Sequence, residues 1–83
     1  MILDMDNDER DARYILRIFR KHNIPVSGYM IIEDVRLEFA KLPHRRPDDF
    51  PAAADYAIRL NWIRTVNEMY RLTVLGHREL KNG

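Results

Sequence analysis

The stretch that decides the fold is residues 61–76, NWIRTVNEMYRLTVLG. Apolar and polar residues alternate on either side of a central Asn-Glu pair, so we expect two short strands, 62–66 and 69–73, joined by a two-residue turn. Asn61 is suited to end a preceding helix, because asparagine tolerates the left-handed backbone conformation better than most residues. Thr73 is suited to cap a short final helix. The stretch therefore predicts a β-hairpin between two helices.

A two-residue turn also fixes which residues of the hairpin face one another. The opposed pairs are Ile63 with Leu72, Arg64 with Arg71, Thr65 with Tyr70, and Val66 with Met69. Ile63 and Leu72 then share one face, and both arginines share the other face with Trp62, Val66 and Met69. Directly opposed like charges destabilise a sheet. The Arg64–Arg71 pair therefore indicates a nearby anion, either a phosphate or an acidic side chain such as Glu68 or Glu79.

Three amphipathic helices are expected before the hairpin. Their apolar spacing places them at about Asp8–His22, Tyr29–Lys41 and Pro47–Leu60. Asn7 or Asp6 is the expected N-cap of the first helix and Ser27 that of the second, while Pro47 begins the third. The outward face of the third helix holds Asp48, Ala52, Asp55 and Arg59, with Tyr56 at its edge, and its inward face holds Phe50, Ala53, Ala54, Ala57, Ile58 and Leu60. The residues expected to be buried are Phe19, Phe39, Phe50, Ala54, Ala57 and Ile63.

Length and composition favour one small globular domain. The chain has 83 residues, of which 46% are hydrophobic and 33% charged. This mix argues against a disordered chain, and no apolar run approaches the ~20 residues that a membrane span needs. Cysteine is absent, which excludes disulfides and thiolate sites. We expect an N-terminal segment at 1–7, a single domain at 8–83, no secretory signal and a cytoplasmic location.

The order helix, helix, turn, helix, hairpin resembles the winged-helix domain, a helix-turn-helix variant common among small prokaryotic proteins. The resemblance covers roughly residues 12–80 and rests on Asn61-Trp62-Ile63 and on residues 70–76, which end in the Leu-Thr-x-x-Gly pattern of a second wing strand. It implies a mainly α fold with a small β-hairpin (α+β), in which a short C-terminal helix follows the wing. Asn61 stands where glycine is common, which is a mild departure.

The resemblance implies a DNA-binding protein, such as a transcriptional regulator, whose third helix enters the major groove. The candidate nucleic-acid contacts are Arg45, Arg46, Tyr56, Arg59, Arg64 and Arg71. Arg45 and Arg46 lie in the basic turn before the third helix, where a merely solvated turn is the alternative interpretation. Two features oppose DNA binding: Asp48 and Asp55 would repel phosphates, and the net charge of +1 gives little long-range attraction.

The alternative is a winged helix used for protein contact or dimerisation, without DNA binding. Its basis is a surplus of apolar residues off the expected core faces, at Tyr14, Ile18, Met30 and Leu37, together with Met1, Ile2, Leu3 and Met5. Monomers seldom expose large contiguous apolar patches, so together these residues indicate an interface. A homodimer is compatible with DNA binding, because paired recognition helices contact two half-sites.

Catalysis is not expected. The only serine, Ser27, is better explained as a helix cap than as a nucleophile. His22, His44 and His77 are far apart and have no metal-ligand spacing, and the chain has no glycine-rich phosphate loop. We therefore expect that the chain is not an enzyme and that it has no cofactor and no metal site.

Overall fold

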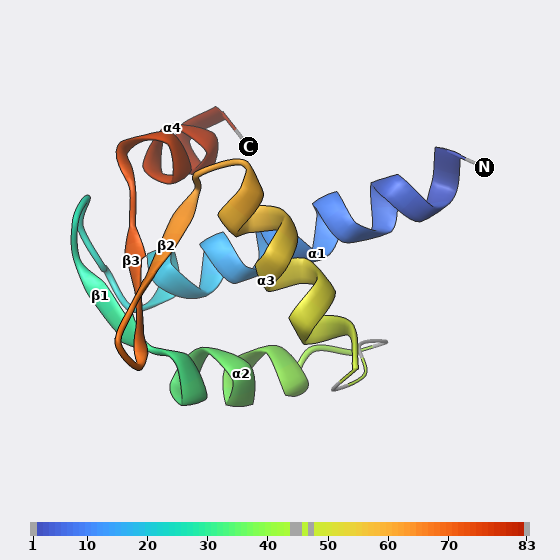
Figure 1. The fold of residues 1–83 in the computed structure, drawn as a ribbon, viewed down its shortest axis with the longest axis horizontal. Helices are drawn as coiled ribbons and strands as arrows, with labels where there is room; N and C mark the ends of the chain where they lie inside the picture. Colours follow the sequence, from blue (N-terminus) through green and yellow to red (C-terminus); the bar gives the residue numbers. More distant parts are fainter. Residues whose placement is uncertain (1, 44–45, 47, 83) are drawn as a thin grey trace.

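The computed structural model describes residues 2–43, 46 and 48–82, with side chains from Asn7 onward (Figure 1). Within this range four helices and a three-stranded antiparallel sheet form an α+β fold. The sheet order is β1-β3-β2, and helices α4 and α2 lie at opposite ends of the sheet in Figure 1. In chain order the elements are α1 (Ile2–Lys21), β1 (Tyr29–Ile31), α2 (Ile32–Ala40), α3 (Asp49–Arg59), β2 (Ile63–Val66), β3 (Met69–Leu72) and α4 (Val74–Asn82).

The hairpin of β2 and β3 has the predicted register. All four expected pairs are confirmed, from Ile63 opposite Leu72 to Val66 opposite Met69. Ile63, Leu72 and Tyr70 turn into the core, while Arg64 stands exposed on the outer face. Trp62 departs from the expected alternation: it precedes β2, and its side chain is buried rather than sharing the outer face with Arg64.

Helix α3 ends as expected at Asn61. This residue adopts the left-handed conformation, with φ 62°. The amide of Trp62 donates to the carbonyl of Ala57 at 2.9 Å, and the amide of Asn61 donates to that of Ile58 at 3.0 Å. These two bonds are the Schellman arrangement, which satisfies the last carbonyls of a helix. Leu60, expected to face inward, is 42% exposed because it sits at the point where the helix stops.

Thr73 and Gly76 join the hairpin to α4. The Thr73 hydroxyl oxygen accepts a hydrogen bond from the Gly76 amide at 3.0 Å, which confirms the predicted cap. The same hydroxyl donates to the Trp62 carbonyl at 2.9 Å. A Cβ atom on Gly76 would lie 2.1 Å from that carbonyl oxygen, so only glycine fits. The Leu-Thr-x-x-Gly pattern thus ties α4 to the joint between α3 and β2.

The structure corrects the start of two helices. Helix α1 begins at Ile2 rather than near Asp8, because residues 2–7 contain no glycine or proline to interrupt it. Helix α2 begins at Ile32, because Tyr29–Ile31 forms a strand on the free edge of β3. Ser27 is consequently not a helix cap: it lies in a left-handed turn with φ 70°, and its amide donates to the Leu72 carbonyl at 2.7 Å. Pro47 lies outside the described residues.

The core lies between the helices and the inner face of the sheet. Helix α1 packs mainly on α3, and the rings of Phe39 and Phe50 meet edge to face, with centroids 5.5 Å apart. All six residues expected to be buried are buried: Phe19, Phe39, Phe50, Ala54, Ala57 and Ile63. In the part of the chain that the structure describes, no helix is both long and apolar enough to cross a membrane.

Candidate nucleic-acid interface

The outward face of α3 carries two carboxylates, Asp48 and Asp55, against one arginine, Arg59. Arg59 lies in the last turn, and its Nε is 3.1 Å from Asp55 Oδ2, with both side chains about two-thirds exposed (68% and 65%). Asp48, just before the helix, is also exposed. The expected base-contacting arginine is therefore neutralised within its own helix, and the two carboxylates would face any nucleic acid that α3 approached.

The turn before α3 contributes Arg46. Its side chain is exposed, and its backbone amide donates to Asp49 Oδ2 at 3.0 Å, which anchors the first turn of the helix. Arg45, the other expected contact in this turn, lies outside the described residues.

Tyr56 lies three residues before Arg59 in α3, and its side chain is half-buried. Its ring packs edge to face on Trp62, with centroids 5.9 Å apart, and burial of the hydroxyl is the main cause of its raised pKa. Tyr56 therefore packs on Trp62, and among the described residues its ring makes no cation contact with Arg46, Arg59, Arg64 or Arg71.

Arg64 and Arg71 lie side by side on the outer face of the sheet. They are direct partners across β2 and β3. The Arg71 guanidinium donates to the Ser27 hydroxyl at 3.1 Å, which leaves its charge unbalanced. Glu79 binds Arg13 instead, at 2.9 Å. Among the residues described, no carboxylate forms an ion pair with Arg64 or Arg71, so the acidic side chain considered from the sequence is not present.

Strand β1 extends this pair into a row across the sheet. Tyr29 is the direct partner of Arg71, so Tyr29, Arg71 and Arg64 share the outer face on three adjacent strands. We call these three residues the sheet row. Tyr29 is 44% exposed. The sequence analysis missed Tyr29 because it placed residues 29–31 in a helix, although Tyr-Met-Ile-Ile is a run that favours strands.

A second basic surface, which the sequence analysis also missed, lies on α1. It consists of Arg10, Arg13, Arg17 and Arg20, and we call it the arginine face. Spacings of three and four residues place these side chains on one side of a helix, opposite the buried Ile15 and Phe19. This spacing is visible in the sequence and would have identified the surface.

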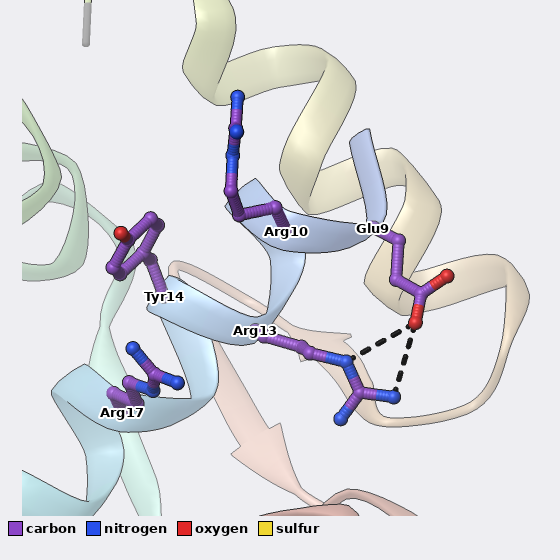
Figure 2. Close-up of a pocket in the computed structure, with 5 residues that line it drawn as sticks. All are labelled: Glu9, Arg10, Arg13, Tyr14 and Arg17. Atoms are coloured by element: carbon purple, nitrogen blue, oxygen red, sulfur yellow. Dashed lines mark hydrogen bonds and ion pairs between the residues drawn. The ribbon is translucent and has the colours of Figure 1, made fainter. Parts of the chain in front are cut away.

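Figure 2 shows three members of the arginine face, Arg10, Arg13 and Arg17, with the contact of Arg13 to Glu9. Arg13 is neutralised: it binds Glu9 at 3.1 Å and Glu79 at 2.9 Å, and its guanidinium carbon lies 5.1 Å from the centre of the Trp62 ring. Arg17 lies over Tyr14, with its guanidinium carbon 5.3 Å from the ring centre. Among the described residues, Arg10 binds the neutral Asn7, at 2.7 Å. The described carboxylates therefore leave the charges of Arg10, Arg17 and Arg20 unbalanced.

Two open hollows flank this surface. One of about 430 Å³ is lined by Arg10, Arg13, Tyr14 and Arg17, together with Glu9 (Figure 2). The other, of about 460 Å³, lies between the end of α1 and α4, and its lining residues are Arg20, Asn23, Ile24, His77, Leu80 and Lys81.

Two of the four apolar residues proposed for an interface, Ile18 and Met30, are in the core. Ile18 is 6% exposed and Met30 is 9% exposed, so neither is the surface residue that the sequence analysis expected. Met30 turns inward because it is the middle residue of β1. Ile18 is buried because the core contacts a wider face of α1 than the four apolar residues of the expected pattern occupy. Leu37 remains exposed at 47%, and Tyr14 is half-buried. The side chains of residues 1–6 lie outside the described part.

Comparison with known proteins gives no relative. No family model matches the chain, and neither the curated proteins nor the solved structures contain a significant match. Within the described ranges, no group of three or more histidine, aspartate or glutamate residues could hold a metal ion. Arguments about function therefore depend on the surfaces described above.

Proposed function

We propose that this chain is a winged-helix domain that binds DNA through α3 and the Arg64–Arg71 pair, in the manner of a small transcriptional regulator. The order α1-β1-α2-α3-β2-β3 and the sheet order β1-β3-β2 support this topology, with α2 and α3 as the helix-turn-helix and β2-β3 as the wing. In that arrangement α3 enters the major groove and its flanks contact phosphates.

The observation that carries the proposal is the Arg64–Arg71 pair. Two directly opposed arginines repel one another, and no described carboxylate offsets the repulsion. Bound phosphate would offset it, and the planar guanidinium group suits bidentate contact with phosphate oxygens. The pair is therefore better explained as a site for an external anion than as a structural contact.

The outward face of α3 should contribute less to DNA binding than the Arg64–Arg71 pair. Arg59 has to leave Asp55 before it can contact a base or a phosphate, and Asp48 adds a second negative charge nearby. We therefore expect binding in which phosphate contacts dominate and sequence discrimination is modest.

The test is a titration of labelled duplex DNA, followed by fluorescence anisotropy at several salt concentrations. Each lost phosphate contact lowers the slope of log affinity against log salt by about 0.9. The double variant Arg64→Gln, Arg71→Gln should therefore bind all duplex sequences more weakly, with a slope smaller by about 1.8. The matched control is Arg17→Gln, Arg20→Gln, which removes two arginines from α1 and should leave the slope unchanged.

Circular dichroism melts of both variants establish that they fold. If the wild type shows no binding below ~100 µM at low salt, it is weaker than ordinary non-specific binding, and the proposal fails. An equal loss of slope in both double variants would also contradict it, because the contacts would then not be specific to the sheet row.

The arginine face favours a second candidate function, contact with an acidic protein partner. Arg10, Arg17 and Arg20 have no described carboxylate partner and border two hollows, of which the one beside Arg20 has the apolar lining residues Ile24 and Leu80. An acidic segment with apolar side chains has the chemistry to fill them. For this function the two variants exchange roles: Arg17→Gln, Arg20→Gln should weaken binding of an acidic peptide, and Arg64→Gln, Arg71→Gln should not.

A further inference from the structure

We propose that the sheet row binds an unpaired nucleotide, with its base stacked on Tyr29 and its phosphates on Arg71 and Arg64. The inference deepens the proposed function and rests on it: the site would favour DNA that carries a single-stranded extension next to a duplex. The three residues belong to β1, β3 and β2, in adjacent positions across the sheet.

Tyr29 differs from the other three tyrosines in having an open ring. Tyr14 is covered by Arg17, Tyr56 packs on Trp62, and Tyr70 is buried near Phe50. Tyr29 is 44% exposed and has no ring or cation contact with any other described residue. An exposed aromatic ring without a partner is a surface on which a base can stack, and stacking tolerates every base.

The position of this ring matches nucleotide chemistry. Neighbouring strands lie about 4.8 Å apart, so the row extends about 10 Å from Tyr29 to Arg64. At about 3.4 Å or more per nucleotide, that length corresponds to at most about three nucleotides. The strand that carries the ring is held next to the arginines by backbone pairing of β1 with β3. Aromatic stacking beside arginine contacts to phosphate is the general mode of single-strand binding.

The adjacent row on the same face is apolar. Ile31, Met69 and Val66 are partners across the three strands, directly beside the sheet row, and Ile31 is 50% exposed. A base that leaves a duplex loses its stacking on neighbours, and an apolar surface beside Tyr29 offsets part of that loss. A base pair inside a duplex is stacked on both faces, so the interior of a duplex uses the arginines alone.

The experiment compares a blunt duplex with the same duplex carrying a short single-stranded thymidine extension at either end. Binding is followed by fluorescence anisotropy at one salt concentration. The wild type should bind the extended duplex about tenfold more tightly, because stacking one base on an aromatic ring has that order of effect. Tyr29→Phe keeps the ring and should keep the preference. Tyr29→Ile keeps a strand-forming apolar residue without a ring and should abolish the preference, while binding of the blunt duplex stays the same.

The outcomes separate this inference from the proposed function. Equal wild-type affinity for both duplexes, with a salt slope that still depends on Arg64 and Arg71, overturns the inference and leaves the function standing. Absence of binding to either duplex overturns both. A preference that survives Tyr29→Ile, or competition by poly-glutamate as strong as that by single-stranded DNA, also overturns the inference, because the site would then recognise charge alone.

Discussion

At the scale of single residues, asparagine and serine, and not glycine, occupy the left-handed backbone positions of the described turns. The described residues with positive φ are Asn23, Ser27, Asn61 and Asn67, and none is a glycine. Asn23 and Asn61 each follow the end of a helix, and Asn67 lies at the turn of the hairpin. Asparagine adopts this conformation at little cost, so these positions do not need glycine. Glycine is needed where there is no space for a Cβ atom. Gly76 is such a position.

Gly76 is required for close approach and not for backbone freedom. In a helix, replacing glycine by alanine normally stabilises by about 1 kcal/mol. Here the added Cβ would lie 2.1 Å from the Trp62 carbonyl oxygen, which is backbone and cannot move aside. Gly76→Ala should therefore lower the free energy of unfolding by about 3 kcal/mol, measured by urea denaturation.

The control for this prediction is Asn82→Ala. Asn82 is exposed in the same helix, so its replacement should change stability by less than about 0.5 kcal/mol. A Gly76→Ala variant that is as stable as the wild type would show that α4 does not pack on Trp62 as described.

At the scale of elements, the sequence pattern predicts the structures whose contacts lie within one short stretch of the chain. The β2–β3 register is predictable because alternation and a two-residue turn fix it within one short stretch. Strand β1 is not, because three residues form a strand only where the edge of β3 is available, and that edge is distant in sequence. Arg64 and Arg71 could therefore be paired from the sequence, whereas Tyr29 could not be placed beside them.

Phe39 is the larger of the two buried residues of helix α2, the other being Val35. Phe39 is fully buried and meets Phe50 of α3 edge to face at 5.5 Å. Phe39→Ala should cost about 3–5 kcal/mol of unfolding free energy, a large share of the total for so small a domain. Leu37→Ala in the same helix is the comparison, since Leu37 is 47% exposed and should cost little. Similar losses in urea denaturation for the two variants would contradict this packing.

At the scale of the whole molecule, the net charge is small, but individual faces carry unequal charge. The net charge is only +1, yet the sheet row and the arginine face each hold arginines without described carboxylate partners. Residues 48–59, which include helix α3, hold three aspartates and one arginine, a net charge of −2. A protein of this kind gains little from long-range attraction, so its binding of nucleic acid should depend on which local carboxylates oppose each contact.

Asp55 is the carboxylate that should oppose binding most directly. Asp55→Asn removes one negative charge from the outward face of α3 and releases Arg59 from its ion pair. We expect several-fold tighter binding of duplex DNA at low salt, and a salt slope steeper by about 0.9 if the released arginine contacts a phosphate. Asp34→Asn changes the net charge equally on the exposed side of α2, and should have a much smaller effect in the same anisotropy titration. Equal gains from both variants would mean that net charge controls binding. No gain from Asp55→Asn would mean that DNA does not approach α3, because a released cation and a lost anion at the contact surface cannot both be without effect.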